Sequence, residues 1–112
     1  MSGTITEGTE FVQATLKVLG GKWKILILWH LRDEAKRFSE LKRLISGISE
    51  KVLAQQLREL EKDGLVLRVS HPSKSPKVEY SFTDYGHSLI PVLEALCHWG
   101  EQHVVRHGTP PM

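Results

Sequence analysis

The sequence predicts a mostly α-helical domain with one small β-hairpin, and three observations lead to this fold class. Apolar residues recur at helical spacing over most of residues 10–64 and again after residue 83. Between these regions the apolar period changes to two, in two short runs separated by the turn-rich segment PSKSPK. Ahead of that change, two short helical patterns flank the tight turn SGIS. This order of elements is that of a winged helix-turn-helix.

Length and composition agree with a single soluble domain. The chain has 112 residues, of which 40% are hydrophobic and 25% are charged, which is enough for one core and too few for two. No apolar run approaches the length of a membrane span, and the N-terminus MSGTITEGTEF lacks the pattern of a signal peptide. Cys97 is the only cysteine, so an internal disulfide cannot form. We therefore expect a cytoplasmic protein with no membrane partner.

Two helices are expected before the turn-linked pair. Residues 1–8 are small and polar and are expected to be flexible. A first helix over residues 10–19 is stopped by a glycine pair, and residues 22–31 form a largely buried second helix. We expect residues 9–107 to belong to a single domain that includes both terminal helices. An irregular tail is expected at residues 108–112.

Capping signals bound the two short helices of the helix-turn-helix. Ser39 is predicted to cap the first of them, with Phe38 packing against it as an apolar staple. Ser49 caps the second, which ends at Gly64, a favourable residue just beyond a helix C-terminus. The residues of the first helix that are expected to face the core are Leu41, Leu44 and Ile45.

The two alternating runs predict a β-hairpin with a lysine-bearing tip. In LVLRVSH, Leu65, Leu67 and Val69 alternate with Val66, Arg68 and Ser70. In VEYSFT, one face carries Val78, Tyr80 and Phe82. Thr83 is then predicted to cap a long amphipathic helix. Because Pro91 lies inside that helical pattern, we expect either a bend or a later helix start.

The helix after Ser49 has two chemically different sides. At 100° per residue, Leu53, Leu57 and Leu60 lie on one side and anchor the helix to the core. The opposite side carries cations and an amide. In the major groove Arg can bond bidentately to guanine and Gln to adenine, while Lys reaches phosphates or guanine. The predicted DNA-binding residues of this helix are Ser49, Lys51, Ala54, Gln55 and Arg58.

A charged outer side is also what any solvated surface helix has, and this helix alone is better explained that way. The hairpin favours DNA binding because it places a second basic element beside the helix. Between Lys36 and Lys77 the chain has ten of its 15 Lys and Arg residues but only five of its 13 acidic residues, as a polyanion-binding surface requires. Arg68 can either join this surface or pair with Glu79 across the hairpin. The predicted phosphate contacts are Arg37, Ser39, Lys42, His71, Lys74 and Lys77.

Three longer segments resemble the HxlR-type family of bacterial winged helix-turn-helix transcriptional regulators, a relative of the MarR-like group. They are LGGKWKILILWHL, RFSELKRLISGISEKVLAQQLRELEKDGLVLR and VEYSFTDYGHSLIPVLEALCHWGEQH, and they cover nearly all of residues 12–103. The resemblance implies a sequence-specific regulator that binds double-stranded DNA as a homodimer on a pseudo-palindromic operator. It places the recognition helix in the major groove and the basic wing over the backbone or minor groove.

The resemblance also implies that the N-terminal and C-terminal helices form the dimer interface. The last helix carries more apolar surface than one small core readily covers, as such an interface needs. The alternative is that some of these apolar residues pack beneath the wing. The predicted interface residues are Leu16, Leu19, Leu93, Leu96 and Trp99.

One part of the family pattern is missing. Many members carry a Cys-Pro pair just ahead of the first helix, and some use it to sense oxidants or electrophiles. Glu10 and Phe11 stand in the corresponding positions here, which argues against an N-terminal redox switch. Cys97, on an apolar helix face, is interpreted as a small packing residue.

Other chemistry finds little support in the sequence. His103 and His107 have the spacing of a helical metal-binding pair, but with His98 they are interpreted as surface residues near a frayed helix end, and we expect no metal or other cofactor. There is no glycine-rich phosphate loop and no nucleophile with a base at motif spacing, so we do not expect an enzyme. The alternative to a DNA-binding regulator is a winged-helix module that binds an acidic protein partner.

A small-molecule effector is not identified by the sequence. The residues that could line a pocket for one, although core positions are more usual for them, are Trp23, Trp29 and Trp99.

Overall fold

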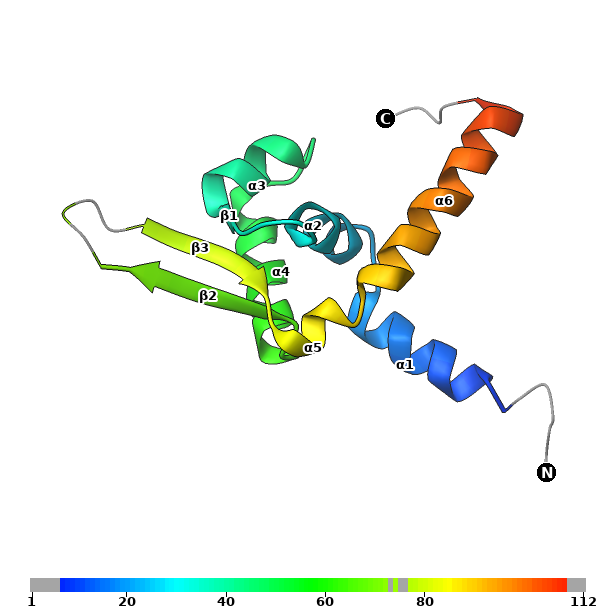
Figure 1. Cartoon of the computed structure of the whole chain (residues 1–112), viewed down its shortest axis with the longest axis horizontal. Coiled ribbons are helices and arrows are strands. Elements are labelled where there is room, and N and C mark those ends of the chain that lie inside the picture. The colour runs from blue at the N-terminus through cyan, green and yellow to red at the C-terminus, as the bar shows by residue number, and fades with distance from the viewer. Residues whose placement is uncertain (1–6, 73, 75–76, 109–112) are drawn as a thin grey trace.

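The computed structural model describes residues 7–72, 74 and 77–108, and its elements follow the predicted order (Figure 1). These residues form α1 (Thr9–Leu19), α2 (Trp23–Leu31), β1 (Lys36–Arg37), α3 (Phe38–Leu44), α4 (Glu50–Lys62), β2 (Val66–His71), β3 (Lys77–Phe82), α5 (Asp84–His87) and α6 (Ile90–His107). Most of the predicted flexible N-terminus and of the predicted tail lies outside the described residues. No helix among those described is both long and apolar enough to cross a membrane.

The core lies where α2, α3 and α4 meet the sheet. The apolar side of α4 is fully buried there, as predicted, with Leu53, Leu57 and Leu60 at most 1% exposed. From α2, Ile27 and Leu28 pack into the same cluster with no exposed surface. Burial of these side chains fixes the rotation of α4 about its axis, so its other side must face away from the core.

Both ends of α4 close as the sequence predicts. At the start, the Ser49 hydroxyl accepts a hydrogen bond from the Val52 N–H at 3.1 Å. At the end, Gly64 has a φ of 77°, a left-handed conformation that favours glycine. The Gly64 N–H donates to the Glu61 carbonyl and the Leu65 N–H donates to the Leu60 carbonyl, both at 3.0 Å. This pair of bonds is a Schellman motif, and it ends the helix where the wing begins.

The cap of α3 differs from the prediction. Arg37, not Ser39, is the N-cap residue, and its N–H donates to the Glu40 carboxylate at 2.8 Å. The helix starts two residues early because Arg37 is already extended as part of β1. Leu41 and Ile45 are buried as expected, but Leu44 is 43% exposed.

The sheet has a strand that the sequence did not reveal. β1 pairs antiparallel with β3, with Lys36 opposite Tyr80, so the strand order is β1-β3-β2. Two residues are too few to show an alternating pattern. The predicted hairpin therefore becomes two strands of a small three-stranded antiparallel sheet, and the mostly helical fold class is confirmed.

Burial along β2 does not follow a simple alternation. Val66 lies opposite Phe82 and is 2% exposed, whereas Leu67 is 49% exposed. Leu65 lies outside the strand because its N–H closes the end of α4. Leu65 and Val66, one from each alternating set, are therefore both buried at the base of the strand, and Arg68 and Ser70 are exposed.

A short helix separates the sheet from α6. Thr83 caps α5, because its hydroxyl accepts from the Gly86 N–H at 2.8 Å and donates to the Gly64 carbonyl at 2.6 Å. α6 begins at Ile90 with Pro91 in its first turn, where a missing N–H costs nothing. Of the two alternatives for this proline, the later helix start is confirmed.

The close approach of α5 to the end of α4 gives a stability prediction. A Cβ at Gly86 would overlap the Leu65 carbonyl oxygen and would lie 3.4 Å from the Phe82 Cβ. We expect Gly86→Ala to lower the free energy of unfolding by roughly 1–3 kcal/mol, measured by denaturant unfolding. Gly100→Ala in α6 is the control, because nothing lies within 4 Å of its new Cβ, and it should raise stability by up to about 1 kcal/mol. Equal effects of the two changes would contradict this packing.

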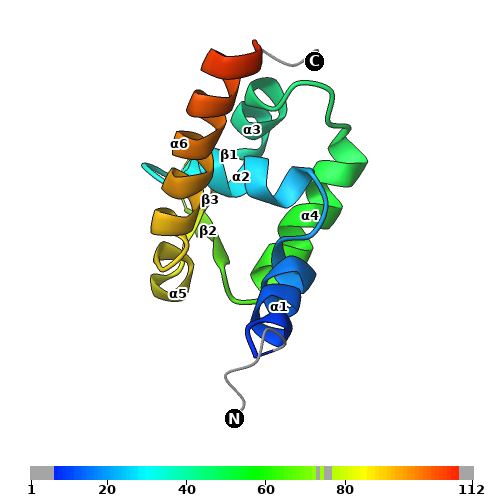
Figure 2. The same ribbon diagram turned by 90° about the vertical axis from the view of Figure 1, so that its right-hand side faces the viewer.

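The terminal helices α1 and α6, here called the arms, project from the core. Figures 1 and 2 show them diverging on the side of the molecule opposite the hairpin. The radius of gyration is 16.3 Å, against about 13 Å for a compact domain of this length. Each arm buries one residue, Leu19 in α1 and Leu93 in α6. The large apolar side chains that the arms leave exposed are Phe11, Val12, Leu16, Val92, Leu96, Trp99, Val104 and Val105.

Candidate nucleic-acid interface

The outer side of α4 is open to solvent. Lys51, Gln55 and Arg58 are all exposed, and Ala54 between them is partly buried. α4 packs against α2 and β2 on its other side, and Figure 1 shows it running across the ends of β2 and β3 nearest α5. The cations and the amide that the sequence pattern singles out are therefore brought together on one uncovered helix face.

A buried lysine of α2 forms an ion pair with this helix. Lys24 in α2 is 7% exposed, and its Nζ lies 2.6 Å from Oε1 of Glu59 in α4. Sequence reasoning placed Lys24 in a buried helix but missed its partner. The only sequence signal is a cation inside the apolar run KWKILILWHL, because a buried ammonium group needs a counter-charge.

The same carboxylate also faces the outer side of α4. The hydrogen bond and charge of Lys24, and a weaker hydrogen bond from the Gln55 side chain, hold the pKa of Glu59 below its usual range. Glu59 is therefore ionised at neutral pH and accepts hydrogen bonds only. It connects a core lysine to a residue that is predicted to read bases.

The hairpin carries its cations at the tip, as predicted. Lys74 is exposed and forms no ion pair with any described residue. His71 and Lys77 face each other where the strands end. Both are near Glu79, whose carboxylate lies 3.0 Å from His71 Nε2 and 3.9 Å from Lys77 Nζ. This acidic residue offsets part of the positive charge at the base of the tip, which the sequence pattern does not indicate.

The strand register decides the alternatives for Arg68. Arg68 lies opposite Tyr80, and Val69 lies opposite Glu79. Because neighbouring residues of a strand point to opposite faces, Arg68 and Glu79 are on different sides of the sheet. The suggested pairing of Arg68 with Glu79 is therefore wrong, and Arg68 is exposed.

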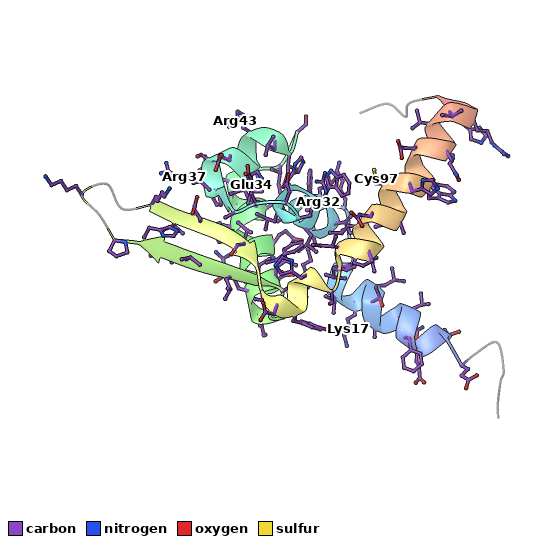
Figure 3. All side chains as sticks on the ribbon, viewed as in Figure 1. Lys17, Arg32, Glu34, Arg37, Arg43 and Cys97 are labelled. Carbon is purple, nitrogen blue, oxygen red and sulfur yellow. The ribbon has the colours of Figure 1, made fainter. Side chains whose placement is uncertain are left out.

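The first helix of the pair adds exposed polar groups beside β1. Arg37, Ser39 and Lys42 are all exposed, and Figure 3 shows Arg37 at the periphery of this part of the molecule. Lys36 belongs to the basic stretch of the sequence but is 9% exposed, with its Nζ 3.5 Å from the Glu34 carboxylate and 3.6 Å from Asp33. Its charge is paired with carboxylates of the same chain, so the basic surface is smaller than the residue count indicates.

The residues predicted for the dimer interface divide into two groups. Leu16, Leu96 and Trp99 are 48–65% exposed and remain available to a partner. Leu19 and Leu93 are 4% and 1% exposed and belong to the core of the protomer. These two side chains therefore already pack within the core of this chain and present little surface to a partner.

The interpretation of Cys97 on α6 as a packing residue is wrong for the single chain. Cys97 is exposed rather than packed, and Figure 3 shows it midway along this arm. Trp99 is 65% exposed and stacks on the His103 ring at a centroid distance of 5.2 Å, whereas Trp23 and Trp29 pack against the core as expected. Within residues 7–72, 74 and 77–108, no three His, Cys, Asp or Glu side chains are grouped so that they could hold a metal ion.

Comparison with known proteins identifies the family. The model of HxlR-like helix-turn-helix proteins matches residues 18–108. The HTH-type transcriptional regulator YtcD of Bacillus subtilis (strain 168) is 54% identical over 95 residues, which are 85% of this chain and 75% of YtcD.

Solved structures agree with this assignment. A crystal structure of an HTH-type transcriptional regulator ytcD has a TM-score of 0.78 and 53% identity, covering 83% of this chain and 95% of that one. The redox regulator HypR in its reduced form has a TM-score of 0.77 and 45% identity, with 81% and 90% covered. A MarR-family regulator from Enterococcus faecalis V583 has a TM-score of 0.77 and 40% identity, with 94% and 96% covered. The chain therefore belongs to the HxlR-like helix-turn-helix family, and the relatives named here are transcriptional regulators.

Proposed function

We propose that the protein is a cytoplasmic, sequence-specific transcriptional regulator that binds a pseudo-palindromic operator as a homodimer. The observation that carries this proposal is the division of α4 into a buried leucine side and an open side bearing Lys51, Gln55 and Arg58. An α-helix fits the major groove, and these side chains match base edges and phosphates. Membership of a helix-turn-helix regulator family supports the same use of the helix.

The exposed groups divide by the part of the duplex that each would contact. Gln55 and Arg58, in the middle of α4, are assigned to base edges, with Ala54 as a small spacer between them. Ser49, at the helix start, is assigned to phosphate, since the first free N–H groups of a helix also bind anions. The remaining groups assigned to phosphates, which position the protein without reading sequence, are Arg37, Ser39, Lys42, Lys51, His71, Lys74 and Lys77.

The arms support the homodimer. α6 has 18 residues and buries only Leu93, while α1 has 11 residues and buries only Leu19. A helix of a water-soluble protein normally covers its apolar stripe, so the exposed apolar residues of both arms need a partner surface. A second copy of the chain offers the same residues and would bring two α4 helices to two operator half-sites.

Selection of bound duplexes from a random pool tests this function. For the wild type we expect an enriched inverted repeat, because two symmetric copies read two half-sites. We expect Gln55→Ala and Arg58→Ala to relax base preference at one position in each half-site, at a cost of about 1–3 kcal/mol there. Lys74→Ala is the matched control and should weaken binding of all sequences similarly, because a phosphate contact carries no base information. Unchanged preferences in both α4 variants would remove the readout assignment.

A further inference from the structure

The ion pair between Lys24 and Glu59 links a buried residue of α2 to a partly exposed residue of α4. Lys24 is nearly inaccessible at 7% exposure, while the Glu59 side chain is 42% exposed. Lys24 therefore cannot contact a duplex itself. Its partner, in contrast, stands at the edge of the surface that the proposed function assigns to DNA.

Glu59 is placed to control the Gln55 amide. The two residues are four apart on α4, so their side chains lie on the same side of the helix, one turn from each other. The Lys24 Nζ lies 2.6 Å from the Glu59 carboxylate, and the neighbouring Gln55 side chain is among the groups that lower the pKa of Glu59. Glu59 also lies in the field of Arg58, the other residue assigned to a base edge.

From this arrangement we propose that Lys24 is a positioning residue for base readout: it holds the Glu59 carboxylate in place, and the carboxylate fixes the orientation of the Gln55 amide. The inference rests on the proposed function and deepens it. It names a core residue that sets operator specificity without touching DNA.

The hydrogen-bond donors and acceptors of these side chains predict the orientation of the Gln55 amide and the base that it reads. An ionised carboxylate only accepts hydrogen bonds, so it must face the NH2 end of the Gln55 amide. A flipped amide would bring its carbonyl oxygen against the carboxylate, which is repulsive. With one N–H bound to Glu59, Gln55 keeps its carbonyl oxygen and one N–H for the groove. Adenine presents the matching N6 donor and N7 acceptor, so we expect adenine at the base pair that Gln55 contacts.

Lys24 is needed because the partly exposed Glu59 carboxylate could otherwise pair with another surface cation. Without a fixed partner, a partly exposed glutamate on a helix can turn to the lysine three residues on, which here is Lys62. The Lys24 ammonium is held by its buried stem and by the cost of leaving a cation unpaired in the core. It therefore keeps the carboxylate on the Gln55 side.

The test is a set of binding measurements on the selected operator and on its three single-base-pair variants at the position read by Gln55. In the wild type we expect a preference of about tenfold or more for adenine. Lys24→Met preserves the length and apolar stem of the side chain and should reduce this preference to within about threefold. Preferences at the other operator positions and the slope of affinity with salt should stay as in the wild type, because Lys24 touches neither bases nor phosphates.

Two further variants separate positioning from a merely structural role. In a Gln55→Ala background the adenine preference is already lost, so adding Lys24→Met should change nothing further at that position. Glu59→Gln keeps the size of the side chain but provides a donor as well as an acceptor, so the Gln55 amide is free to flip. It should reproduce the loss of preference, and circular dichroism of both variants will show that each is folded.

The outcomes are distinct from those that test the function itself. A folded Lys24→Met protein with wild-type adenine preference overturns the inference, and so does an equal loss of preference at every operator position. If the wild type selects no sequence at all, the proposed function fails and this inference fails with it. If the wild type selects an operator and both Lys24→Met and Glu59→Gln read it as the wild type does, only the inference fails.

Discussion

Raising the salt concentration from 50 to 200 mM is expected to lower the affinity of the proposed dimer for the operator that it selects by about a thousandfold or more. Each phosphate that a cation neutralises releases counterions, and roughly eight such interactions produce a fall of this size. The exposed cations of α3, α4 and the wing, present twice in a dimer, can supply them. Lys36 is not among them because it is buried beside Asp33 and Glu34. Titrations at several salt concentrations measure the slope.

Single variants show which exposed cations contribute to the dependence of affinity on salt concentration. Lys51→Ala and Lys74→Ala should each make the slope shallower by about one for every phosphate that is no longer neutralised, or about two for the dimer. Lys17→Ala is the matched control, since Lys17 is an exposed lysine on α1, away from the wing (Figure 3). It should leave the slope unchanged. Equal effects of all three variants would mean that the positive charge acts without a defined binding face.

Placing a charge on the arms is expected to prevent formation of the proposed dimer. Leu96→Asp or Trp99→Asp puts a carboxylate on exposed apolar positions of α6, where desolvation of the charge in an interface is costly. The variants should be monomers by sedimentation, and their operator affinity should fall by about a hundredfold or more, because one chain then binds one half-site without the effective concentration of the second.

A variant of matched exposure controls for the change of surface polarity. Leu67→Asp alters a residue that is 49% exposed on β2, compared with 48% for Leu96. It should remain a dimer. If the Leu96 variant sediments like the wild type, or the Leu67 variant is also monomeric, the arms are not the interface.

The parts of this fold that the sequence predicts are those with local signals repeated along the chain. α4 has a leucine on every turn, a serine cap and a terminal glycine, so its bounds and its buried side could be read directly. Elements without such repetition were missed. β1 has two residues and α5 has four, and each exists only because other segments pair with it or pack against it.

Tertiary contacts account for the errors in the candidate site. The alternating pattern of LVLRVSH does not reveal that Leu65 lies outside β2, where its N–H donates to the Leu60 carbonyl at the end of α4. The charge count included Lys36, whose partners became apparent only in three dimensions. The pairing of Lys24 with Glu59 joins residues 35 positions apart, and no spacing rule connects them. Sequence patterns thus identify the face of α4, whereas the contacts that hold it require the structure.

Site-specific photocrosslinking tests most directly whether α4 and the wing lie against the same duplex. The photoreactive residue p-benzoylphenylalanine would replace Gln55, Lys74 or Lys17, one at a time, in the complex with the selected operator. We predict crosslinks from position 55 to the centre of each half-site, crosslinks from position 74 to the flank of the same half-site, and none from position 17. Crosslinking from position 17 as efficient as from 55, or a wing that never reaches the DNA bound by α4, would contradict this account.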